Sequence, residues 1–212
     1  MNKYIFFLFG LFSSICAVGQ DQHAKNLLDE VSKKYNGYQT IEAKFTFKAV
    51  PATGESYQDN GTLYLNKIAG QYKIILKEQD LISDGKSVWS VLKEDKEVQV
   101  SQADNSAQSI GPNNIFTFYK EGYKYISMDD QKSDIGLLKV IELSPENKNS
   151  NYFKIKLRIN QKNHIHDVTI HDKSGAKYIY TINNLYVNHT IASSTFQFQK
   201  SQFPGFEVVD LR

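Results

Sequence analysis

The feature that most constrains this chain is a one-by-one alternation of apolar and polar side chains that begins at Ile41. Ile41, Ala43, Phe45, Phe47 and Ala49 stand on one side of this run, with polar or charged residues between them. Because successive side chains of a strand point to opposite faces, the pattern predicts a half-buried β-strand. Similar runs, separated by turn sequences, follow at residues 61–66, 72–77, 87–92, 97–101, 137–144, 153–160, 165–171, 177–185 and 195–198. About ten short strands at this spacing predict a mainly β chain with an antiparallel, meander-like sheet.

A different period marks the segment before the first strand. Its apolar residues recur at the spacing of one helix face, and these residues are Ala24, Leu27, Leu28, Val31 and Tyr35. A second apolar segment, residues 115–119, interrupts the strands and fits either a short helix or a buried loop. Since a long sheet must close or curl, we expect both segments to cover its concave side. Periodicity does not separate a packed core from a cavity inside it, and a packed core is the usual case.

Residues 1–19 have the order of a secretory signal peptide. Lys3 provides the positive start, residues 4–15 form an apolar run, and a small-residue site ends at Gly19. We expect cleavage near Gly19, which leaves residues 20–212 as a single domain in an exported compartment. Cys16 would suggest a lipid anchor, but Ile15 stands where a lipoprotein signal has a small residue. Cleavage removes Cys16, and therefore excludes thiol chemistry and thiolate metal sites.

The mature chain offers little that would support catalysis. It contains no nucleophile elbow, no glycine-rich phosphate loop and no complete calcium loop, so we expect no enzyme and no cofactor. His164, His166 and His171 could contribute to a metal site, but no third ligand is fixed by spacing, and exposed histidines on a hairpin are the simpler interpretation. The net charge of +2, which becomes +1 when Lys3 is lost, gives no general attraction to nucleic acid.

Four segments together resemble the periplasmic outer-membrane lipoprotein carrier family, the LolA type. They are Gly-Thr-Leu-Tyr-Leu at 61–65, the stretch from Gln-Asp-Leu-Ile-Ser to Asp-Gly-Lys-Ser-Val-Trp at 79–89, Asn-Ile-Phe-Thr-Phe-Tyr at 114–119, and the ending from Phe-Gln-Phe to Asp-Leu-Arg at 196–212. Their order and spacing match over nearly the whole mature chain. The combination of the second and fourth segments is more specific than either one alone.

The resemblance implies an incomplete, unclosed antiparallel β-barrel in which N-terminal and central helices form a lid over an apolar cavity. It also implies a periplasmic carrier that takes triacylated lipoproteins from an ATP-driven releasing complex in the inner membrane and delivers them to an outer-membrane lipoprotein receptor. A lipid-sensing periplasmic regulator with the same barrel is the alternative. On this view the cavity and lid residues are Phe45, Phe47, Leu63, Leu65, Ile74, Leu76, Trp89, Ile115, Phe116 and Phe118.

One position departs from the better-known members of that family. An arginine followed by proline comes after their Gly-x-Leu strand, and this arginine is implicated in lid closure. Here Lys67 and Ile68 stand at those positions. A lysine offers a point charge instead of a planar fork of donors. The resemblance therefore suggests Lys67 as a lid latch, and an exposed turn lysine is the competing interpretation.

Overall fold

The computed structural model describes residues 21–103, 112 and 114–212, so the expected signal peptide at 1–19 lies outside the described residues. The described part forms one α-helix, three short 3-10 helices and twelve strands. The helices are α1 (Gln22–Asn36), η1 (Phe118–Lys120), η2 (Ser193–Phe196) and η3 (Lys200–Gln202). The strands are β1 (Thr40–Val50), β2 (Tyr57–Asn66), β3 (Gln71–Ile75), β4 (Gln79–Ser83), β5 (Ser87–Leu92), β6 (Glu97–Gln102), β7 (Tyr123–Ser133), β8 (Gly136–Pro145), β9 (Tyr152–Ile159), β10 (Ile165–Asp172), β11 (Lys177–Val187) and β12 (Glu207–Asp210).

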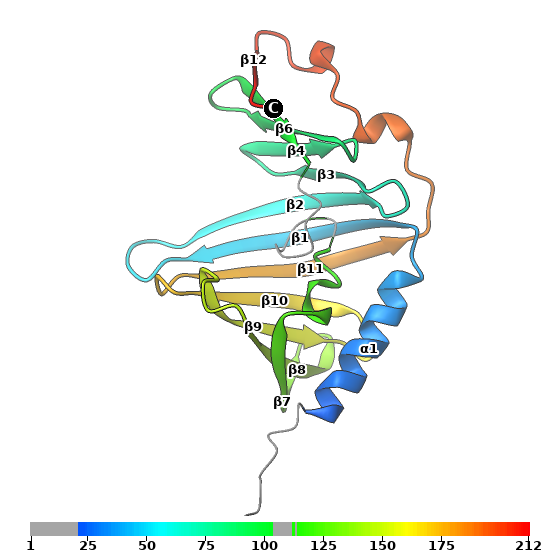
Figure 1. Cartoon of the computed structure of the whole chain (residues 1–212), viewed down its shortest axis with the longest axis vertical. Coiled ribbons are helices and arrows are strands. Elements are labelled where there is room, and N and C mark those ends of the chain that lie inside the picture. The colour runs from blue at the N-terminus through cyan, green and yellow to red at the C-terminus, as the bar shows by residue number, and fades with distance from the viewer. Residues whose placement is uncertain (1–20, 104–111, 113) are drawn as a thin grey trace, which may run out of the picture.

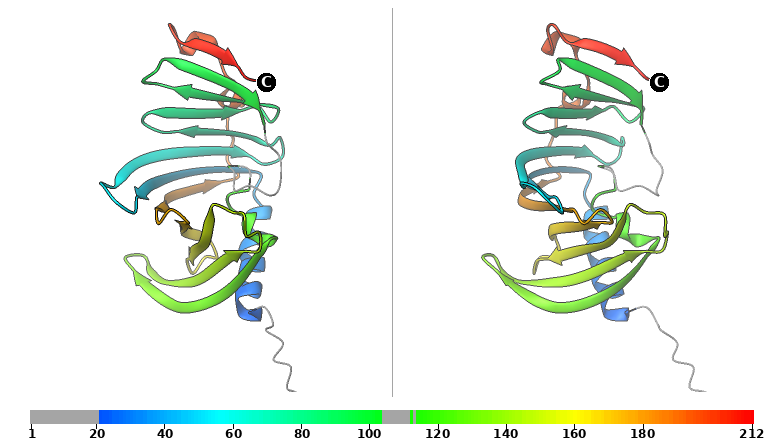
Figure 2. Two further views of the ribbon diagram at one scale, coloured as in Figure 1. Left: turned by 60° about the vertical axis from the view of Figure 1, so that its left-hand side comes forward. Right: turned by 90° about the vertical axis from the view of Figure 1, so that its left-hand side faces the viewer.

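All twelve strands join one sheet in the order β12-β6-β5-β4-β3-β2-β1-β11-β10-β9-β8-β7. Neighbours are antiparallel except β12, which runs parallel to β6. The edge strands lie at opposite ends of the long axis, β12 at the top and β7 at the bottom, with α1 beside the lower strands (Figure 1). Figure 2 shows that β7 and β8 are strongly curved, whereas β3 to β6 are flatter. The sheet therefore curls without closing into a barrel, as the resemblance implied.

Helix α1 forms where the sequence predicts it. Its expected apolar face, Ala24, Leu27, Leu28, Val31 and Tyr35, is buried. This face packs on the same side of the sheet as Ile41, Ala43 and Leu65, which makes α1 a cover of the concave face. The central segment, the expected second cover, does not form in its described residues the helix that the resemblance implied. In the central segment the described residues contain one 3-10 turn at Phe118–Lys120 and no α-helix. A central helical lid is therefore not confirmed.

The carboxylate of Asp21 ties the start of α1 to the free edge of the sheet. One carboxylate oxygen accepts hydrogen bonds from the backbone N–H groups of His23 and Ala24, as in an ordinary N-cap. The other accepts the N–H of Ser127 in the edge strand β7, at 2.7 Å. These bonds, led by the one from Ser127, lower the pKa of Asp21 to about 2. One side chain thus caps a helix and occupies part of an exposed strand edge.

The hydrogen bonds of Asp21 should therefore contribute less to stability at acid pH. Because the pKa of Asp21 is lower in the folded chain than in the unfolded one, its contribution is complete above pH 4 and is lost as the pH falls towards 2. We expect Asp21→Ala to lower the melting temperature at pH 7 by about 2–4 °C, the usual effect of a lost cap in a domain of this size. Thermal melts at pH 7 and pH 2 check this. If the difference in melting temperature between wild type and variant is as large at pH 2 as at pH 7, the prediction is contradicted.

A second apolar core lies on the opposite face of β3 to β6. Ile82, Val91, Val98 and Val100 are buried there beneath the chain that returns from β11 to β12, which contributes the buried Phe196. The residues predicted as a strand at 195–198 belong partly to the 3-10 helix η2 in this cover, so that prediction is wrong. Because both faces of β4 are covered, Leu81 and Ile82 are adjacent apolar residues, and the alternation that identifies a half-exposed strand is missing.

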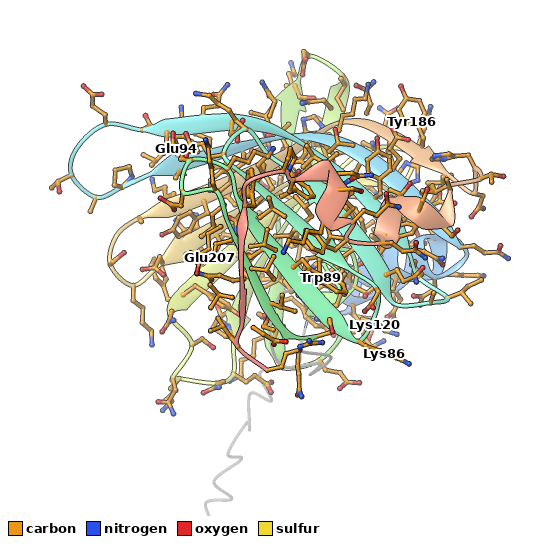
Figure 3. The ribbon with its side chains drawn as sticks, turned by 90° about the horizontal axis from the view of Figure 1, so that it is seen from above. Lys86, Trp89, Glu94, Lys120, Tyr186 and Glu207 are labelled. Carbon is orange, nitrogen blue, oxygen red and sulfur yellow. The ribbon has the colours of Figure 1, made fainter. Side chains whose placement is uncertain are left out.

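Two of the family-like segments meet at this end of the molecule. Figure 3 looks onto it, with Trp89 on β5 and Glu207 at the start of β12. The Trp89 ring stacks on Phe198, with ring centroids 5.8 Å apart. Arg212 donates a hydrogen bond to the Ser87 hydroxyl. Gly85 has φ +93°, and a Cβ there would lie 2.7 Å from the carbonyl oxygen of Ala69. The contacts between these two segments therefore stabilise the β12 end of the sheet.

Candidate functional site

An apolar cavity of about 240 Å³ lies on the concave face of the sheet. Strands β1, β2, β3, β10 and β11 supply its floor, and the central segment supplies its cover. Its lining consists of Ala43, Phe45, Leu63, Ile74, Pro112, Ile115, Phe116, Ile165, Val168, Ile170, Tyr180 and Ile182. Tyr180 alone among these side chains carries a polar atom, and burial raises its pKa, so its hydroxyl stays neutral at pH 7. The cavity thus suits hydrocarbon.

The register of the sheet explains how distant segments form one floor. Phe45 lies opposite Ile182 in β11 and opposite Gly61 in β2. A Cβ at position 61 would collide with the Phe45 ring and lie 2.9 Å from Leu76. The glycine of the Gly-Thr-Leu-Tyr-Leu segment is therefore the residue that lets the Phe45 ring lie across β2. A larger residue would push this ring out of its position on the cavity wall.

The last turn of α1 is joined to the cavity cover and to the sheet. The Tyr35 ring stacks on Phe116 with centroids 4.5 Å apart and planes 6° from parallel. Its hydroxyl accepts the backbone N–H of Ile165 at 3.2 Å. The ammonium of Lys67 donates to the Tyr35 carbonyl at 2.6 Å. Burial lowers the pKa of Lys67, which is half-buried. Helix end, cover and β2–β3 turn are thus one connected unit.

Aromatic side chains extend the apolar floor beyond the cavity. Phe47 lies opposite Tyr180 in the β1–β11 ladder, and their ring centroids are 5.0 Å apart. Tyr178 and Tyr57 also pack against Phe47, with centroid separations of 6.4 and 6.3 Å. All four rings remain partly exposed. We call this group of Phe47, Tyr57, Tyr178 and Tyr180 the aromatic shelf.

The structure divides the cavity and lid residues suggested by the resemblance into several places. Phe45, Leu63, Ile74, Ile115 and Phe116 line the cavity. Leu65 and Phe118 are buried in the surrounding core. Phe47 lies on the aromatic shelf, and Leu76 lies beside the site of Gly61. Trp89 is a correction: it stacks on Phe198 at the opposite face of the sheet, because its neighbour Val88 is the β5 residue that faces the concave core.

Sequence reasoning missed the part of the wall that β10 and β11 provide. The missed residues include Ile165, Val168, Ile170, Tyr180 and Ile182. Both strands were predicted from their alternation. However, nothing in the alternation shows that β11 pairs with β1, which lies far away in the sequence. Only this pairing brings their inward side chains opposite Phe45.

The three histidines His164, His166 and His171 each contact a different partner. His164 shares a hydrogen bond of 2.7 Å with the Tyr38 hydroxyl, and burial lowers its pKa. His166 approaches Asp167 at 3.6 Å, and His171 packs against the Phe153 ring. Among the residues that the structure describes, no group of three or more His, Cys, Asp or Glu side chains could hold a metal ion. The described helices also include none long and apolar enough to cross a membrane.

Comparison with known proteins gives this geometry a family. The model of the family "Outer membrane lipoprotein carrier protein LolA" matches residues 36–199, which is most of the chain. The chain belongs to the LolA family. Members of this family are binding or carrier proteins rather than enzymes, and are typically periplasmic or secreted. No curated protein sequence matches the chain.

Solved structures show the same fold at low sequence identity. An uncharacterized conserved protein from Thermus thermophilus aligns with a TM-score of 0.59 at 11% identity, over 89% of this chain and 99% of that one. The lipoprotein LppX from Mycobacterium tuberculosis aligns with a TM-score of 0.50 at 12% identity, over 80% of this chain and 98% of that one. Proteins with very different sequences therefore adopt the same fold as this chain.

Proposed function

We propose that this LolA-family protein is a periplasmic carrier that shields the acyl chains of lipoproteins between the inner and outer membranes. The apolar cavity carries the proposal, because the described residues of its wall offer hydrocarbon contact and include no charged group. Each methylene removed from water contributes about 0.8 kcal/mol, so long acyl chains need such a shield. Transfer needs binding and release alone, without a covalent step. Its partners would be triacylated lipoproteins, an ATP-driven releasing complex and an outer-membrane receptor.

The size of the cavity indicates that loading requires opening. At about 240 Å³ the cavity is smaller than the range of about 300–1,000 Å³ that is usual for sites that hold a single small ligand. Three chains would need a displaced cover and the neighbouring aromatic shelf. Phe116 belongs to the cover that would have to move, and its stack on Tyr35 joins this cover to α1 and, through the Tyr35 carbonyl, to Lys67. The described form is therefore best understood as a closed one.

A release assay tests the proposal. Purified mature protein is added to inner membranes that carry newly acylated lipoproteins and the releasing complex, and soluble lipoprotein complexes are collected. We expect a one-to-one soluble complex with wild type. Failure to recover lipoprotein with a folded protein would contradict the carrier role. Binding of free lipid without any lipoprotein release would favour the lipid-sensing alternative instead.

The Lys67 contact leads to a prediction about ligand exchange. Lys67→Met keeps most of the apolar stem but removes the hydrogen bond to the Tyr35 carbonyl. If this bond holds the cover closed, an acyl probe should dissociate about threefold to tenfold faster, the effect of one hydrogen bond. Stopped-flow fluorescence measures the rate. Lys67→Arg, which retains a donor, should stay near wild type, and equal rates in all three proteins would leave Lys67 an ordinary turn lysine.

A further inference from the structure

The sheet is split between β10 and β11 at the end nearest α1. Their ladder pairs Asp167 to His171 with Lys177 to Thr181 and stops there. Strand β11 continues to Val187, but its last residues pair with β1 alone. On the other side of the split, the N–H of Ile165 donates to the Tyr35 hydroxyl, so the start of β10 is held by α1. Two adjacent strands of one sheet thus separate at a defined point.

A second pocket, of about 400 Å³, occupies this split, and we call it the β10–β11 pocket. This volume lies within the range of about 300–1,000 Å³ that is usual for ligand pockets. Its polar lining consists of Asp134, Asn160, His164, His166, Thr181 and Asn183. Its apolar lining consists of Ile135, Ile165, Ile182 and Leu185, and of these Ile165 and Ile182 also line the apolar cavity. These two isoleucines are therefore a shared wall between a pocket of mixed polar and apolar lining and an apolar cavity.

The polar groups define which chemistry the pocket can accept. Within the described part of the chain, the exposed Asp134 carboxylate and the half-buried Thr181 hydroxyl make no hydrogen bond to other groups, so both are available to a ligand. The Asn183 carboxamide donates to Thr46, which leaves its oxygen as an acceptor. These acceptors suit ligand hydroxyl groups. A phosphate would instead meet the carboxylate of Asp134, which opposes its binding, although the ammonium groups of Lys34 and Lys162 lie near His164 in the same pocket.

We propose that the β10–β11 pocket binds the uncharged glyceryl ester end of an acylated ligand, whose hydrocarbon passes between Ile165 and Ile182 into the apolar cavity. The inference rests on the proposed function, since it needs acyl chains in that cavity. It adds a recognition site with polar groups in the split between β10 and β11. The glyceryl group could belong to an acylated lipoprotein or to a free acylglycerol, because both present the same ester and hydroxyl groups.

The test compares two ligands of equal chain length. A 1-monoacylglycerol and a fatty alcohol compete with a fluorescent apolar probe for wild type and for the double variant Asp134→Ala with Thr181→Val. The fatty alcohol reports the cavity alone. The matched control combines Asp129→Ala, an exposed acid on the same hairpin, with Thr169→Val, a half-buried threonine on β10 outside the pocket. We expect wild type and control to prefer the acylglycerol about tenfold, as for one or two hydrogen bonds.

The double variant should lose this preference and keep its affinity for the fatty alcohol. An equal preference in wild type and double variant would overturn the inference and leave the proposed function standing. Failure of both ligands to displace the probe would overturn both. Stronger binding of an acylglycerol phosphate than of the acylglycerol would also overturn the assignment to an uncharged end. Comparing a diacylglyceryl lipopeptide with free diacylglycerol then shows which source of the glyceryl ester is preferred.

Discussion

Replacing Ile170 with glutamate should strongly weaken acyl-chain binding while the protein remains folded. Ile170 is half-buried on the cavity wall, so a carboxylate there would enter the space that hydrocarbon must fill. Burying a charge without a partner is costly, and the variant can avoid this cost by admitting water and excluding the acyl chain. We expect the affinity for an acyl probe to fall at least about a hundredfold. Fluorescence titration measures the affinity, and circular dichroism checks the fold.

The neighbouring residue supplies the matched control. Thr169 precedes Ile170 on β10, and its side chain points to the opposite face of the sheet. Thr169→Glu adds the same charge to the same strand, and we expect the affinity to stay near that of wild type. Wild-type affinity in Ile170→Glu would show that acyl chains bind elsewhere. Equal losses in both variants would indicate a general effect of charge on β10.

Replacing Tyr35 with alanine should lower the free energy of unfolding by about 3–5 kcal/mol, the usual cost of removing a large buried ring. Tyr35 is 0% exposed, and its ring, hydroxyl and carbonyl contact Phe116, Ile165 and Lys67 respectively. Tyr35→Phe keeps the ring stack but leaves the Ile165 N–H without its acceptor. We expect this second variant to lose about 1–3 kcal/mol. Urea denaturation measures both values.

Tyr186 is the control, because it is a half-exposed tyrosine at the surface of β11. Tyr186→Ala should change the free energy of unfolding by no more than about 0.5 kcal/mol. A loss as large as that of Tyr35→Ala would contradict a special role for Tyr35. Burial also raises the pKa of Tyr35, so its ionisation in the unfolded chain alone should reduce stability above pH 10.

Local patterns of the sequence predict the helix and most of the strands correctly. The apolar face of α1 is readable because a helix that covers a sheet buries one stripe, and Leu27 to Tyr35 follow it. Strand β1 is readable because its two faces differ in solvent exposure near Ile41 and Ala43. The predicted runs do not include β4, because both of its faces are covered, or β7, because it is an edge strand with Ile126 and Met128 exposed. They also omit β12, a strand of only four residues.

The sequence by itself predicted a mainly β chain, an opening helix that covers it and the resemblance to the LolA family, since these depend on local periodicity and short motifs. Tertiary structure alone decided what the motifs do. It placed Trp89 at the second apolar core, on the face of the sheet opposite the cavity. It brought Phe45 next to Ile182 through the pairing of β1 with β11. It also opened the split at Ile165. The physical reason is that strand pairing and register are set by contacts between residues far apart in the chain, which periodicity along the chain does not record.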